Sequence, residues 1–169
     1  MNHTTTETEH AKTFDSATTP EQLAQFSEQL QAQAERVVSK LPLLGAVTWL
    51  MMQHNTTRHT LISDLEWRVM PPLVLDQAKL YMRNNAPVAY VSWAKLSEEV
   101  ANRYCSVPHQ LAMGDWQSGD QIWIVDLYAP FGGATAVLQD LRDSVLKGLV
   151  INRLTLGDNA KLAPTVLNA

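Results

Sequence analysis

The stretch that decides the fold is Gln121-Ile122-Trp123-Ile124-Val125-Asp126-Leu127-Tyr128-Ala129, which runs into the turn residues Pro130-Phe131-Gly132-Gly133. β-Branched and aromatic side chains dominate this run, so it predicts a buried strand followed by a tight turn. Asp126 stands out there, because a buried carboxylate is costly unless it is paired or hydrogen-bonded. Two interpretations follow: Asp126 is a structural residue bonded to the adjacent loop, or it belongs to a functional site.

Regular elements are expected on both sides of this strand. Helices are expected over residues 19–40, 43–52, 61–67, 98–104 and 134–147, and strands over residues 78–83, 88–93, 121–129 and 149–156. Pro71-Pro72 is expected to close the third helix, the first two strands form a hairpin, and the tail after residue 156 is expected to be irregular. This order predicts an α+β or mixed α/β domain in which helices cover a central sheet.

The N-terminal part is predicted to divide into a tail and a helix. Residues 1–18 are rich in Thr, Glu and His, which is typical of disorder. Thr19-Pro20-Glu21-Gln22 then has the pattern of a helix start, with a Thr cap and Pro at the first helical position. Apolar residues recur at helical spacing along this added helix, at Leu23, Phe26, Leu30, Ala34 and Val37. We therefore expect a tail over 1–18, an amphipathic helix over 19–40 that docks on the domain or on a second copy, and a domain over 41–169.

Composition narrows the functional class. The chain has 169 residues, of which 46% are hydrophobic and 18% charged, and this fits one compact domain with a real core. A pI near 5.7 gives no electrostatic case for binding nucleic acid or an anionic membrane. The single cysteine, Cys105, cannot form an intrachain disulfide, which favours an intracellular protein. The longest apolar run, Leu41–Met52, is too short for stable membrane insertion, and no signal peptide is visible, so a cytoplasmic location is expected.

Four segments stand in order and at near-constant spacing: Leu44-Gly45-Ala46-Val47-Thr48-Trp49-Leu50, Pro87-Val88-Ala89-Tyr90-Val91-Ser92-Trp93-Ala94, Asp115-Trp116-Gln117-Ser118-Gly119-Asp120 and Asp126-Leu127-Tyr128-Ala129-Pro130-Phe131-Gly132. They resemble the RTX toxin-activating lysine acyltransferases, the hemolysin-activator family. The resemblance implies an α+β, GNAT-like fold with a central, mostly antiparallel sheet flanked by helices. It also implies a fatty acyltransferase that activates an RTX protoxin by moving an acyl group from acyl–acyl carrier protein to internal lysine ε-amino groups. No other cofactor is implied, and a homodimer is expected.

The resemblance further implies the site residues. The family uses a histidine and an aspartate; the aspartate falls on Asp126, whereas Thr57 occupies the histidine position. His54 and His59 stand on either side of Thr57 and are the candidate catalytic histidines, with His59 preferred because it follows the matched basic residue Arg58. The implied substrate-binding residues are Ser92, Trp93, Phe131, Gly132 and Gly133.

The chemistry of acyl transfer explains these residue types. A lysine attacks a thioester only after it loses a proton, and a neutral imidazole can accept that proton. A carboxylate can fix the imidazole tautomer, and backbone N–H groups at the glycine turn can stabilise the oxyanion. A metal site is not expected, because His54 and His59 have no Cys or acidic ligand set beside them. The alternative is a non-catalytic homologue that binds acyl carrier protein or the toxin without acylating it, and Thr57 favours that alternative.

Overall fold

The computed structural model describes residues 19–106, 110–156 and 162–167. The predicted disordered tail over residues 1–18 lies outside these ranges. The chain divides into two compact units, which are residues 1–36 and residues 37–169.

Helix α1 spans Pro20–Gln53 without interruption. The predicted start of this helix is confirmed, and its cap is reciprocal: the Thr19 N–H donates to Oε1 of Gln22 at 2.9 Å, and the Gln22 N–H donates to Oγ1 of Thr19 at 3.3 Å. The sequence predicted two helices with a break near Pro42, and this was wrong, because Pro42 lies inside α1. Proline removes one helical hydrogen bond, but Pro42 and Val38, four residues earlier, are both exposed, so water can solvate the freed carbonyl.

A five-stranded sheet forms the centre of the second unit, in the order β1-β2-β3-β4-β5. Its strands are β1 (Ala78–Arg83), β2 (Ala86–Leu96), β3 (Gln121–Tyr128), β4 (Ile151–Leu156) and β5 (Leu162–Val166). Every neighbouring pair is antiparallel except β3 and β4, which are parallel and joined through α5 (Ala134–Asp143). The predicted α+β class with a mostly antiparallel sheet is therefore confirmed, and the arrangement is consistent with a GNAT-like fold.

Strand β5 corrects the prediction of an irregular tail. It pairs with β4 at the edge of the sheet, and Pro164 stands opposite Leu154. Proline is tolerated in an edge strand because one side of that strand needs no hydrogen-bond donors. The sequence did not predict this strand, because Pro164 disfavours strands and the side chains directly after it are exposed, so the segment lacks a buried apolar pattern.

Short helices follow α1 along the chain: α2 (Asp64–Arg68), α3 (Met70–Val74), α4 (Glu98–Ser106) and the 3₁₀ helix η1 (Met113–Trp116). Pro71-Pro72 was predicted to close a helix, but the pair instead lies in the first turn of α3. The first N–H groups of a helix have no intrahelical acceptor, so prolines fit there without loss of a hydrogen bond.

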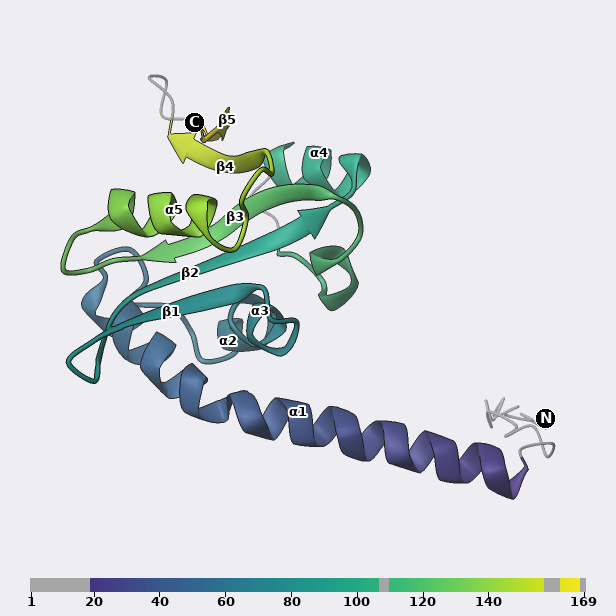
Figure 1. Ribbon diagram of the computed structural model, residues 1–169. Coiled ribbons are helices and arrows are strands. Elements are labelled where there is room, and N and C mark those ends of the chain that lie inside the picture. The colour runs from purple at the N-terminus through teal and green to yellow at the C-terminus, as the bar shows by residue number, and fades with distance from the viewer. Residues whose placement is uncertain (1–18, 107–109, 157–161, 168–169) are drawn as a thin grey trace, which may run out of the picture. The chain divides into compact units, whose positions relative to one another are not determined.

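Helices cover both faces of the sheet (Figure 1). Helix α5 packs on one face, against a buried cluster that includes Val91, Trp93 and Ile124. On the other face, the C-terminal part of α1 and the α2–α3 pair pack around Tyr90 and Tyr128. Helix α4 and η1 extend this second face with their own buried cluster. Strand β2 is consequently buried on both faces, and it borders the candidate site.

Candidate functional site

A β-bulge in β3 sets the direction of Asp126. Ser92 pairs with Asp126 and Trp93 pairs with Ile124, so Val125 is an extra residue with no partner in β2. Before the bulge, Ile124 faces α5, and after it Leu127 packs against the same cluster. Without the extra residue, strand alternation would send Asp126 into the apolar face under α5. The bulge turns it instead toward the face covered by α1, α2 and α3.

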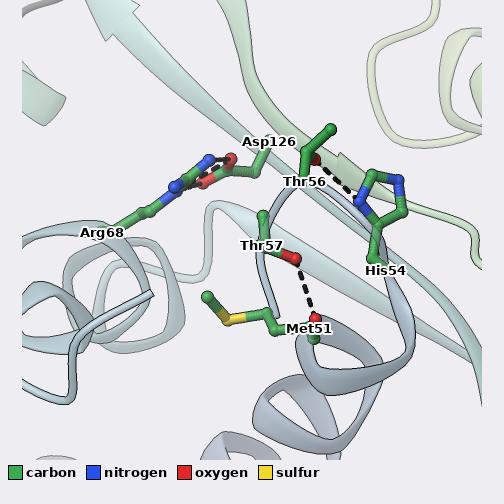
Figure 2. Close-up of polar contacts among 6 residues, drawn as sticks. All are labelled: Met51, His54, Thr56, Thr57, Arg68 and Asp126. Carbon is green, nitrogen blue, oxygen red and sulfur yellow. Dashed lines mark hydrogen bonds and ion pairs between the residues drawn. The ribbon is translucent and has the colours of Figure 1, made fainter. Parts of the chain in front are cut away.

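Asp126 forms a bidentate ion pair with Arg68 of α2 (Figure 2). Nε of Arg68 donates to Oδ1 at 3.0 Å and to Oδ2 at 2.9 Å, and Nη2 donates to Oδ1 at 2.5 Å. Only 3% of the Asp126 side chain is exposed, whereas 28% of the Arg68 side chain is. Burial alone would lower the pKa of Arg68, but the hydrogen bonds and the charge of Asp126 raise it, so the guanidinium stays protonated.

Buried hydroxyl groups surround this ion pair. The hydroxyl oxygens of Tyr90, Ser92 and Tyr128 are fully buried, and none makes a hydrogen bond of normal geometry with the part of the chain that the structure describes. The rings of Tyr90 and Tyr128 stack at 5.6 Å, and Cζ of Arg68 lies 5.8 Å from the centre of the Tyr128 ring. Burial raises the pKa of both tyrosines, and the charge of Asp126 raises it further, so both phenols remain neutral. The site therefore combines a fixed ion pair with buried O–H groups.

The predicted histidines lie in the turn segment that follows α1. Nδ1 of His54 is 2.9 Å from Oγ1 of Thr56, and its ring lies 5.9 Å from the ring of Tyr128. Thr57 is buried, and its Oγ1 donates to the carbonyl oxygen of Met51 at 3.0 Å (Figure 2). His59 is exposed in the turn that follows. Within the described ranges, the hydrogen bonds of Asp126 come from Arg68, and neither imidazole supplies one.

Arg68 is the site residue that the sequence analysis missed. It stands 58 residues before Asp126 in the chain, within a helix of five residues. No local pattern distinguishes its side chain from a solvated arginine near a helix end. The one available signal was indirect: a carboxylate in an apolar strand calls for a cation from elsewhere in the chain.

The predicted substrate-binding residues fall in three places. Ser92 stands beside Asp126 by register, whereas Trp93 points into the core under α5. Phe131, Gly132 and Gly133 come together with the ends of β1 and α5 around a cavity of about 480 Å³. Both glycines have left-handed backbone, with φ of 89° and 86°, and Gly133 caps the N-terminus of α5.

The described residues contain neither a cluster of metal ligands nor a membrane-spanning helix. No three His, Cys, Asp or Glu side chains converge as metal ligands would among the residues that are described. In the same residues, every helix is too short or too polar to cross a bilayer.

Several known proteins are similar in sequence to the part of the chain that contains this site. The sequence model of the RTX toxin acyltransferase family matches residues 36–166, which include the whole sheet and both members of the ion pair. The RTX-II toxin-activating lysine-acyltransferase ApxIIC of Actinobacillus pleuropneumoniae is 37% identical over 100 residues, or 59% of this chain and 62% of that protein. The protein-lysine myristoyltransferase RtxC of Kingella kingae is 32% identical over 112 residues, or 66% of this chain and 67% of that protein. The protein-lysine myristoyltransferase HlyC of Escherichia coli is 38% identical over 102 residues, or 60% of this chain and 59% of that protein. The matched part of the chain thus spans about three fifths of the length of ApxIIC and HlyC.

Proposed function

The chain belongs to the RTX toxin acyltransferase family, and we propose from this membership that it is a protein-lysine acyltransferase. In the proposed reaction, a fatty acyl group moves from acyl–acyl carrier protein to internal lysine ε-amino groups of an RTX protoxin. The observation that carries the proposal is the family match over residues 36–166. The names of the relatives support it, since each is called a lysine acyltransferase or a protein-lysine myristoyltransferase.

Two features of the second unit, the ion pair and the cavity, support acyl transfer. Asp126 and Arg68 provide a fixed ion pair at the middle of the sheet, and the pair remains partly accessible through Arg68. The cavity beside Phe131 and the glycine pair offers apolar walls, among them Met82 and Val88, for part of an acyl donor. This cavity lies on the α5 side of the sheet, with Ala89 and Val137 in its wall, whereas the ion pair lies on the opposite face.

A homodimer and a cytoplasmic location belong to the same proposal. In the first unit, Leu23, Phe26 and Leu30 are 57%, 58% and 51% exposed. They recur along one stripe of α1, and an apolar stripe of this kind favours a partner surface. A second copy of the chain is the partner we infer, and the cytoplasm is where an acyl carrier protein would meet a newly made protoxin.

The direct test is acylation in a purified system. The full chain is incubated with myristoyl–acyl carrier protein and its cognate RTX protoxin, and the toxin lysines are mapped by mass spectrometry. We expect a mass increase of one acyl group at specific internal lysines, absent when those lysines are replaced with arginine. Free fatty acid in place of the acyl carrier protein thioester is the matched control and should give no product. Failure to acylate any cognate protoxin would contradict the proposal.

One observation favours a second function, that of a non-catalytic binding protein. Thr57 occupies the position of the family histidine, and Arg68 already engages both carboxylate oxygens of Asp126. A chain without an available base could still bind acyl carrier protein or the protoxin. Light scattering and calorimetric titration with each partner separate the two functions: binding without acyl transfer supports this second function, and stoichiometric acylation excludes it.

A further inference from the structure

We propose that Arg68 is a catalytic residue of this chain: its guanidinium donates to the oxyanion formed on the acyl thioester, and Asp126 is the positioning residue that holds it. The proposal rests on the acyltransferase function above. It differs from the arrangement expected from the sequence, in which Asp126 orients a histidine. In the structure, the partner of Asp126 is a permanent cation.

The first support is the division of donors on Arg68. Nε and Nη2 donate to Asp126, whereas Nη1 makes no hydrogen bond with any described residue. The carboxylate is almost fully buried, and the accessible part of the pair belongs to the arginine. Of the two charged side chains, that of Arg68 is therefore the one that a substrate can reach.

The second support is the rigidity of the guanidinium. A bidentate pair fixes both the plane and the direction of an arginine fork. The ring of Tyr128 lies beside the same guanidinium, and Tyr90 stacks on that ring. Donors that are fixed before the reaction stabilise a developing oxyanion without reorganisation. Asp126, with both oxygens bonded, is suited to holding Arg68 rather than to accepting the proton of the substrate amine.

The third support concerns the titratable groups around Arg68. Those that face it are Asp126 and Tyr128 of β3, Tyr104 of α4 and, through Tyr128, Tyr90 of β2. The tyrosines remain neutral near pH 7 because burial raises the pKa of each. The ring of His54 also lies 5.9 Å from the ring of Tyr128, but among the described residues it makes no hydrogen bond with Arg68 or Asp126.

The reaction balances without a histidine. The lysine ammonium first loses its proton to solvent, and the lone pair of the amine forms a bond to the thioester carbon. The carbonyl π pair moves to oxygen, where Arg68 stabilises it, and the attacking nitrogen releases its second proton to water. The oxygen pair returns, the carbon–sulfur bond breaks, and sulfur leaves with the bonding pair as a thiolate that takes up one proton. The products are the lysine amide and the carrier thiol.

The test compares Arg68 variants with a variant that lacks His54 and His59, using myristoyl–acyl carrier protein and the cognate protoxin. Arg68→Ala should lower kcat by about 10²- to 10³-fold with little change in KM, as loss of an oxyanion donor does. Arg68→Lys keeps a cation beside Asp126 but loses the fork, so it should fold and still lose most of kcat. Millimolar guanidinium should restore part of the activity of Arg68→Ala, which a purely structural role would not allow. The double variant His54→Ala/His59→Ala should keep the wild-type rate.

The pH profile gives an independent readout. With solvent as the proton acceptor, kcat/KM for the protoxin should rise steadily between about pH 7 and 9, as more of the lysine loses its proton. A break near about pH 6.5, together with loss of activity in the double histidine variant, would identify an imidazole base and overturn the proposal. A folded Arg68→Lys or Arg68→Ala with wild-type kcat would also overturn it. A wild-type chain that binds its partners but transfers nothing would overturn the proposed function itself, and the Arg68 assignment with it.

Discussion

Replacing Arg68 with methionine would leave the carboxylate of Asp126 without a cation, at a position where only 3% of that side chain is exposed. Removing one partner of a buried ion pair costs about 3–5 kcal/mol, because the remaining charge stays desolvated. For a chain of this length, each kcal/mol lowers the melting temperature by about 2–4 °C. We therefore expect Arg68→Met to melt roughly 6–20 °C below the wild type.

Replacing Asp126 with asparagine should cost less. The guanidinium that remains is 28% exposed, so it can turn its charge toward water. We expect a loss of about 1–3 kcal/mol, mainly from donors that lose their charged acceptor. The double variant Arg68→Met/Asp126→Asn removes both charges together, and its loss should be smaller than the sum of the two single losses by about 1–3 kcal/mol.

Urea denaturation at pH 7, followed by far-UV circular dichroism, measures all four proteins of this cycle. The slope of unfolding free energy against urea should stay constant across them, so that shifts in midpoint report stability. Two results would contradict the prediction: an Arg68→Met variant at least as stable as Asp126→Asn, or a double variant whose loss equals the sum of the two single losses. Either result would mean that the two groups do not form a buried, coupled pair.

Three further predictions concern other parts of the chain. Gly119→Ala would place a Cβ atom 2.5 Å from the backbone N and Cα of Ser97, so it should lower the free energy of unfolding by about 1–3 kcal/mol. Gly114→Ala is the matched control: its Cβ would have nothing within 4 Å, so urea denaturation should show no change in stability. Light scattering at micromolar concentration should show a homodimer for the full chain and a larger monomer fraction after deletion of residues 1–36; a monomeric full chain contradicts the dimer, and an intact dimer after deletion contradicts the role of α1. Burial raises the pKa of the Cys105 thiol above its ordinary value, so at pH 8 less of it is thiolate and iodoacetamide should alkylate it more slowly than free cysteine; an equal rate would contradict this.

Local features of the sequence predicted much of the fold because their physical causes act over a few residues. The Thr19–Gln22 capping box, the hairpin of β1 and β2, and the strand–glycine turn–helix order of β3 and α5 all follow from neighbours in the chain. The same local pattern picked out Asp126, since a carboxylate inside an apolar strand conflicts with its surroundings whatever the fold.

Features that depend on distant segments were decided only by the tertiary structure. Pairing with β4 makes a strand of residues whose own pattern, with Pro164 among them, does not indicate one. One extra residue in β3 turns Asp126 to the opposite face of the sheet. That bulge is created by the pairing of β3 with β2, which the sequence of β3 alone does not specify. Arg68 reaches Asp126 across 58 residues because α2 packs on that face. The sequence by itself determined that Asp126 needs a partner; the packing of α2 against the sheet decided that the partner is an arginine, because an ion pair forms between whichever groups the fold brings within reach.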